Sequence, residues 1–409
     1  MEGQPCLRVS LHHVQHFRKS LQAQGVLDQS ACLLKEPTGT VLLPIVHASV
    51  SQLDLQCLRT TVGSGSICEL VWTQSPLPSK NKTRGRDGNK LERILQELLE
   101  SCGERWTDDI RGDIPKNLQR HGDLVLLGDN CLTLPVWKKL DQNLWSAVTQ
   151  GLGAKRLARM SRISSDGFRS PVVTMLVGDH SWVKHVDNGI SYEFDVTKCM
   201  FSAGNITEKL RVASFDCRGE TVVDLYAGIG YFTLPYLVHA GASHVHACEW
   251  NPDAVDALRK NLLTNGVQDR CTIHRGDNRQ VQLCDVADRI NLGLIPSSED
   301  GWPVACRLLK RRTGGILHIH QNVTSPLASA AAFQSIKPDT SRSVSGKKAD
   351  RAAWTLWADD AANHIASLLQ EITAAPWRTS ILHIEHVKSY APRVHHVVLD
   401  LECRPVNTL

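Results

Sequence analysis

The sequence predicts an α/β protein whose C-terminal half is a doubly wound, mostly parallel sheet, preceded by smaller α/β domains. From residue 191 onward, short apolar runs typical of buried strands alternate with helix-like stretches, as in a sheet covered by helices on both faces. One run, VVDLYAGIGYF at 222–232, ends in an acid and a turn with two glycines. The predicted strands span 221–225, 244–248, 271–274, 289–294, 315–319 and 381–387, and 394–401 is expected to add a final edge strand.

The chain of 409 residues is long enough for two or three domains. Residues 1–75 are expected to form a small N-terminal α/β unit, because 14–21 is amphipathic and 41–46 is apolar. The polar, basic stretch 76–90 contains Pro and Gly and predicts a linker. Residues 91–190 predict a second α/β domain, and 191–409 predict the large sheet, with a flexible insertion rich in Ser, Ala and Lys at 324–350.

A basic run in the second domain places five cations within 15 residues: Lys155, Arg156, Arg159, Arg162 and Arg169. Such a run predicts either a stripe that faces phosphates or the solvated face of a helix, and the two interpretations carry equal weight.

Composition points to a soluble cytoplasmic protein. No apolar run approaches the roughly 20 residues that span a bilayer, and charge and histidine interrupt the first residues, unlike a secretory signal. The 13 cysteines include no C-x-x-C pair, which is typical of reduced thiols rather than of a disulfide framework or a zinc site. A net charge of +4 permits a nucleic-acid partner without requiring one. Neither a membrane partner nor a metal is expected.

Polar residues follow three successive strands, at the edge of a parallel sheet where ligands bind. The first strand ends at Asp224 and leads into a turn that contains Gly228 and Gly230, which would let a ligand approach the backbone and would allow positive φ. The second ends at Glu249, a carboxylate able to accept both ribose hydroxyls, and the third is followed by Asp277 and Asn278, placed to accept from an adenine amino group. Together they predict a bound adenosine.

Two adenosine-containing cofactors fit this arrangement, S-adenosylmethionine and NAD. NAD is compatible with an acid about 20 residues beyond the glycines. However, Thr233 stands where the third glycine of a dinucleotide motif would fall, and Asp277 marks a third strand end that suits an adenine. These features favour S-adenosylmethionine over NAD.

Seven motifs are specific enough to indicate a protein family: YEFDVTKCMFSAGNITEKLRVA, DLYAGIGYFTLPYLVHAGA, CEWNP, GDN, NLGLIPS, GGILHIHQN and HVKSYAP. They resemble the eukaryotic tRNA wybutosine-synthesising protein 2 family, which is related to the tRNA guanine-37 N1-methyltransferases. The resemblance covers at least 113–402 and is most specific between 191 and 325. It implies the class I S-adenosylmethionine-dependent methyltransferase fold for 191–409 and a tRNA-binding role for 91–190.

The resemblance also implies an activity other than methylation. The family transfers the 3-amino-3-carboxypropyl group of S-adenosylmethionine to carbon 7 of 4-demethylwyosine, at position 37 of phenylalanine tRNA, and releases methylthioadenosine. Ser202 and Lys209 of FSAGNITEK are implied to contact the cofactor, alongside Glu249, Asp277 and Asn278; Arg211 is an alternative cation, or a partner of Glu208 on the same helix. No catalytic base and no oligomeric state are assigned.

Two other functions remain open. One is a tRNA guanine-37 N1-methyltransferase, which the altered loop NLGLIPS disfavours, because related amine methyltransferases carry Asn-Pro-Pro-Tyr or Asn-Leu-Pro there. The other is a non-catalytic RNA-binding module, which the intact acids disfavour.

Several histidines near the C-terminus have alternative interpretations. His318 and His320 share one face of a strand, either near the site or packed against the sheet. Strand alternation separates His383 from His386, and His395 from His396, so a shared metal site is not expected.

Overall fold

The computed structural model describes residues 3–10, 13–36, 39–60, 67–73, 80–116, 118–164, 170–201, 205–326 and 342–406. The chain divides into two compact units, Met1–Arg162 with Val172–Ser181 and Ile163–Pro171 with Trp182–Leu409.

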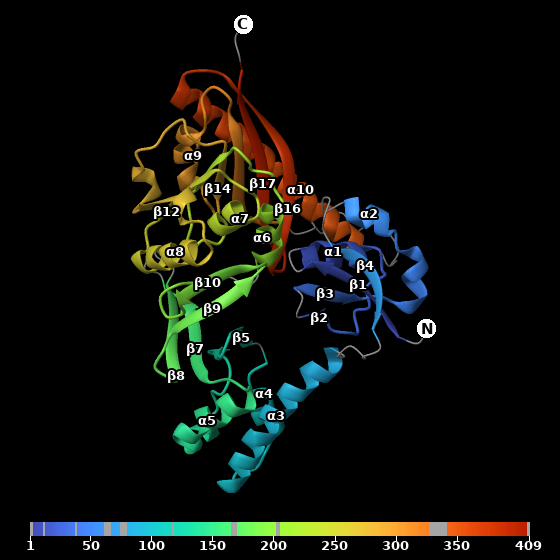
Figure 1. Cartoon of the computed structure of the whole chain (residues 1–409). Coiled ribbons are helices and arrows are strands. Elements are labelled where there is room, and N and C mark those ends of the chain that lie inside the picture. Colours follow the sequence, from blue (N-terminus) through green and yellow to red (C-terminus); the bar gives the residue numbers. More distant parts are fainter. Residues whose placement is uncertain are drawn as a thin grey trace, which may run out of the picture. The chain divides into compact units, whose positions relative to one another are not determined.

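The first module of the N-terminal unit is a four-stranded antiparallel sheet with helices (Figure 1, blue). Its elements are β1 (Gln4–Ser10), α1 (Val14–Ala23), β2 (Leu34–Lys35), β3 (Thr40–Pro44), α2 (Leu55–Thr60) and β4 (Cys68–Thr73), with strand order β2-β3-β1-β4. Val14, Phe17 and Leu21 are buried on one side of α1, because their spacing of three and four residues places them on the same face. They pack on the sheet and close a small core.

The second module contains α3 (Lys80–Ser101), α4 (Asp108–Gly112), β5 (Leu118–His121), β6 (Leu124–Gly128), α5 (Asp141–Gly151), β7 (Arg156–Ile163) and β8 (Pro171–Val177). Its strand order is β5-β6-β7-β8. Leu91, Leu95 and Leu99 recur along one face of α3 and are buried in the same core as Val148 of α5.

Two expectations for this region are wrong in part. The predicted linker 76–90 contains the beginning of α3, since the helix starts at Lys80; residues 74–79 lie outside the described part of the chain. The Lys and Arg residues of this stretch are good helix formers, and they extend the apolar helix that follows. Arg156, Arg159 and Arg162 of the basic run lie in β7 rather than on a helix face, because parallel pairing with β6 overrides the helix propensity of Leu, Ala and Met.

Two described arginines of that run contact groups within the protein. Arg156 is only partly exposed and its guanidinium pairs with Asp123 at 2.5 Å, while the Arg159 guanidinium lies 5.3 Å from the centroid of the Trp145 ring. Arg169 lies outside the described residues.

The C-terminal unit begins with the hairpin of β9 (Trp182–Asp187) and β10 (Ile190–Asp195), followed by α6 (Ile206–Ala213). Asn188 and Gly189 make the hairpin turn with φ of 49° and 77°, the left-handed conformation that two-residue hairpin turns require. Asn261 and Asn265 then fasten the hairpin: the Asn261 side chain accepts from the Glu193 amide, and the Asn265 side chain bonds both backbone groups of Ser191.

The main sheet has seven strands in the order β13-β12-β11-β14-β15-β17-β16. They are β11 (Thr221–Asp224), β12 (His244–Glu249), β13 (Cys271–Arg275), β14 (Arg289–Leu292), β15 (Gly315–Thr324), β16 (Trp377–Ala391) and β17 (Val394–Pro405). The first five are parallel, and β17 is antiparallel to both of its neighbours. The helices are α7 (Thr233–Val238), α8 (Pro252–Thr264), α9 (Trp302–Leu308) and α10 (Arg342–Thr373) (Figure 1). The predicted fold class is confirmed.

The expected edge strand at 394–401 is an internal strand. β17 pairs with β15 on one side and β16 on the other, so β16 forms the edge. Residues 395–401 are all buried, including His395, His396 and Asp400, whereas much of β16 is exposed, as expected for an internal strand beside an edge strand.

The expected flexible insertion at 324–350 overlaps helix α10. The helix starts at Arg342, and its apolar face, which includes Ala358, Ile365 and Leu369, packs into the core of the sheet. Residues 327–341 lie outside the described residues. Within the described parts of the chain, no helix is long and apolar enough to cross a membrane.

Candidate cofactor site

The glycine turn connects β11 to α7 at the carboxyl edge of the sheet. Gly228 has φ of 56° and Gly230 has φ of 102°, so both adopt backbone conformations that side chains disfavour, as predicted. A Cβ atom on Gly230 would lie 3.0 Å from a methyl of Leu258 and 3.1 Å from Leu234. The turn therefore requires glycine at residue 230 for both conformation and packing.

Asp224, the last residue of β11, lies directly before the glycine turn. Its carboxylate has no exposed surface and accepts hydrogen bonds from the side chains of Asn291 at 3.0 Å and Thr233 at 2.8 Å. Burial raises the pKa of this carboxyl group. Thr233, at the position of the absent third glycine, thus supplies a hydroxyl that fixes Asp224. A direct contact between Asp224 and a cofactor stays a prediction.

Glu249 joins the end of β12 to the glycine turn. One carboxylate oxygen accepts from the Gly228 amide at 2.7 Å, and the other accepts from the Asn251 amide at 2.8 Å. Burial raises the pKa of the Glu249 carboxyl. Both carboxylate oxygens are thus held at the carboxyl edge of the sheet, where the predicted contact to two ribose hydroxyls would form.

Asp277 and Asn278 follow β13, beside this group. The Asn278 amide donates to the Leu225 carbonyl at 2.8 Å, which ties the third strand end to the first. Asp277 accepts from the Arg279 guanidinium at 2.6 Å, and this contact lowers the pKa of the Asp277 carboxyl. The bond from the Gly228 amide to Glu249 therefore links the ends of β11 and β12, and the bond from Asn278 to the Leu225 carbonyl links the ends of β11 and β13.

The remaining predicted ligands precede β11. Ser202 lies outside the described residues. Lys209 of α6 has a side chain that is 3% exposed; its ammonium is ion-paired with Asp187 and lies 5.0 Å from the centroid of the Phe201 ring. Its contact with a cofactor stays a prediction.

Arg211, the alternative cation, points to the sheet. Its guanidinium donates to both oxygens of Glu208 at 2.8 and 2.7 Å, and to both oxygens of Asp400 at 2.5 and 3.0 Å. With its donors engaged in this way, Arg211 stabilises the fold, and the pairing with Glu208 is the correct alternative.

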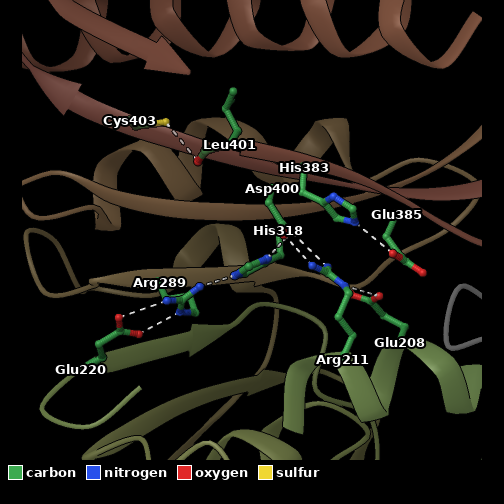
Figure 2. Close-up of polar contacts among 10 residues, drawn as sticks. All are labelled: Glu208, Arg211, Glu220, Arg289, His318, His383, Glu385, Asp400, Leu401 and Cys403. Carbon is green, nitrogen blue, oxygen red and sulfur yellow. Dashed lines mark hydrogen bonds and ion pairs between the residues drawn. The ribbon is translucent and has the colours of Figure 1, made fainter. Parts of the chain in front are cut away.

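Arg211 belongs to a largely buried polar network that local sequence patterns did not predict. We call it the α6 network, and Figure 2 shows its members: Glu208, Arg211, Glu220, Arg289, His318 and Asp400. His318 lies between Asp400, 2.6 Å from its Nδ1, and Arg289, 2.9 Å from its Nε2. Because the guanidinium only donates, the imidazole fits as the neutral tautomer with its proton on Nδ1. Burial lowers the pKa of His318, consistent with that form.

The other histidines follow strand alternation. His395 contacts the ring of Trp354 on α10, whereas His396 bonds His320 at 3.0 Å on the opposite face of the sheet. Burial lowers the pKa of His320 well below its usual range. These contacts place His318 and His320 in the packing of the sheet.

Three family models match the chain. The TRM5/TYW2 methyltransferase domain matches 183–344, and two TYW2 N-terminal domain models match 7–82 and 95–181. The tRNA wybutosine-synthesizing protein 2 homolog of Danio rerio is 55% identical over 415 residues, covering 99% of this chain and all of that protein. The Homo sapiens homolog is 51% identical over 413 residues, covering 96% of this chain and 92% of its own length.

The chain belongs to the tRNA wybutosine-synthesizing protein 2 family.

Solved structures agree with this assignment to the wybutosine-synthesizing family. P. horikoshii TYW2 in complex with MeSAdo is 28% identical and has a TM-score of 0.55; the match covers 77% of this chain and 99% of that chain. Trm5b from Pyrococcus abyssi has a TM-score of 0.53 at 19% identity, a likeness of fold alone. The family uses S-adenosylmethionine as cofactor.

Proposed function

We infer that this protein transfers the 3-amino-3-carboxypropyl group of S-adenosylmethionine to carbon 7 of 4-demethylwyosine in phenylalanine tRNA. The observation that carries this inference is the 55% identity with a wybutosine-synthesizing homolog over essentially the whole of both chains, N-terminal modules included. MeSAdo, bound in the P. horikoshii structure, is the methylthioadenosine that remains after the group has been transferred.

The residues at the strand ends fit an adenosine cofactor. Backbone amides hold the Glu249 carboxylate in place at the end of β12, as expected for a ligand of a ribose diol. The positive-φ glycines bring backbone to the same edge without side chains. When bound, S-adenosylmethionine supplies a sulfonium with three electrophilic carbons, and the protein selects among them by position.

The loop after β14 distinguishes this site from that of an amine methyltransferase. Asn291 is fully buried, and its amide nitrogen donates to Asp224, so that this donor is engaged within the protein. Related amine methyltransferases carry Asn-Pro-Pro-Tyr or Asn-Leu-Pro at this point to hold the nucleophilic nitrogen, whereas this chain reads Asn291-Leu-Gly-Leu-Ile-Pro-Ser297. The altered loop favours a carbon nucleophile.

The two N-terminal modules are proposed to serve the tRNA. Residues 1–75 would form one module and 91–190 the tRNA-binding domain, while 191–409 hold the cofactor; the limits of the three family models support this division. A cytoplasmic location agrees with a tRNA substrate.

Doubly labelled cofactor tests the activity. The protein is incubated with phenylalanine tRNA that contains 4-demethylwyosine and with S-adenosylmethionine labelled at both the carboxyl carbon and the methyl carbon. The carboxyl label should enter RNA, and the methyl label should remain in methylthioadenosine. A matched tRNA with unmodified guanosine at position 37 should accept neither label; entry of the methyl label into either tRNA would instead indicate a methyltransferase.

A further inference from the structure

The ammonium of Lys209 lies against one carboxylate and two aromatic rings, which together form the Lys209 site. Asp187, the last residue of β9, is its ion-pair partner, and the ring centroids of Phe201 and Tyr192 lie 5.0 and 5.3 Å from the nitrogen. The side chains of Lys209 and Asp187 are only 3% and 16% exposed. A buried ammonium is costly without a carboxylate partner, so Asp187 stabilises the charge of Lys209 in this position.

The Lys209 site contacts the segment that ends at Phe201 and, through Phe201, the glycine turn; both segments are predicted to hold the cofactor. Phe201 directly precedes Ser202, and its ring lies 5.9 Å from that of Tyr231 in the glycine turn. The Tyr231 hydroxyl donates to the Met200 carbonyl, which fastens the two segments together. Lys209 therefore lies beside the point where Tyr231 of the glycine turn contacts Met200 and Phe201.

The β9–β10 hairpin holds Asp187 in place. Asp187 directly precedes the tight Asn188-Gly189 turn, and His239, which follows α7, contacts the Asn188 carbonyl at 2.8 Å. Because the hairpin is also fastened to α8, the carboxylate is fixed relative to the glycine turn. Asp187 thus lies on a rigid hairpin, as a residue that orients another side chain should.

We propose that Asp187 is a positioning residue that holds the Lys209 ammonium ready for the carboxylate of the cofactor's aminocarboxypropyl arm. This rests on the proposed function, in which that arm is the group transferred. The Lys209 ammonium has three N–H donors, and one of them bonds Asp187. The aromatic faces attract the positive charge but do not take up the other two donors as strong hydrogen-bond acceptors would. Asp187 therefore acts on recognition of the arm and leaves recognition of the adenosine to Glu249 and the glycine turn.

Two ligands separate these parts in a binding experiment. S-adenosylmethionine carries the arm, whereas methylthioadenosine lacks it. With Asp187→Asn, the dissociation constant for S-adenosylmethionine, measured by calorimetry, should rise about tenfold, and that for methylthioadenosine should change less than twofold. Adding Lys209→Met to the variant should cause little further loss, because both substitutions remove the same contact.

Matched variants make the result decisive. Glu193→Gln alters the same hairpin but removes only contacts with the partly exposed Lys184 and Lys260, so it should leave both affinities unchanged. Asp187→Glu keeps the charge and should recover part of the affinity for S-adenosylmethionine, even if the Asn variant folds poorly. An equal loss for both ligands, or an unchanged or tighter affinity for S-adenosylmethionine, would overturn the proposal. Failure of the proposed function would appear separately, as methyl label in the tRNA.

Discussion

Removing Arg211 should destabilise the C-terminal unit strongly. The guanidinium donates four hydrogen bonds to two carboxylates, and the Glu208 and Asp400 side chains are 0% and 10% exposed. Burial would raise the pKa of Asp400, but bonds from His318 and Arg211 lower it well below its usual range. With Arg211→Met, two buried like charges lose their shared cation, which typically costs about 3–5 kcal/mol. For a unit of this size, the thermal midpoint should fall by roughly 10 °C.

Chemical denaturation monitored by circular dichroism measures the loss in unfolding free energy. Arg218→Met is the matched control, because its partner Asp216 is at the surface and both side chains are largely exposed; the unfolding midpoint should not change. Glu208→Gln added to Arg211→Met should recover part of the loss, because it removes one of the two opposed charges. A loss below about 1 kcal/mol for Arg211→Met would refute a structural role for the α6 network.

Three further outcomes are expected. Gly230→Ala should cost more stability than Gly153→Ala, by a difference of about 1–3 kcal/mol in denaturation; both have positive φ, but only Gly230 would bring a Cβ within 3.1 Å of packed leucines. Glu249→Gln should weaken S-adenosylmethionine binding at least tenfold by calorimetry and lower the unfolding free energy by about 1–3 kcal/mol, since one backbone amide loses its acceptor; unchanged binding would contradict the ribose contact. Burial lowers the pKa of His396 from 6.5 to about 4. The unfolded chain therefore takes up the proton first, and stability present above pH 6.5 should fall toward pH 4, by up to about 3 kcal/mol, with a shallower slope in His396→Phe.

Local patterns predicted the features that depend on neighbouring residues. The strand at 221–225, its glycine turn and the acid at 249 all follow from apolar runs and the residues that end them. The order of the last two strands did not follow, because pairing of β17 with β15 joins residues about 80 positions apart. The bond from Arg211 to Asp400 spans 189 positions and leaves only an isolated acid in an apolar run as its signal. Likewise, β7 has a sequence that suits a helix and becomes a strand through pairing with β6.

The two cations of α6 contact different elements, since Lys209 pairs with Asp187 of the hairpin and Arg211 pairs with Asp400 of the sheet. Lys209 and Arg211 are two positions apart, which separates them by about 200° around a helix, so one faces the hairpin while the other faces the sheet. A helix of eight residues has little stability of its own, and tertiary contacts must fix its rotation. The bidentate contacts of Arg211 with Glu208 and Asp400 do so from the sheet side. That rotation places Lys209 against Asp187, and a lysine at 211 could not reproduce the paired geometry, because it lacks the planar fork. If Lys209 binds the cofactor arm as proposed, the α6 network supports that contact by fixing the rotation of the helix that carries Lys209.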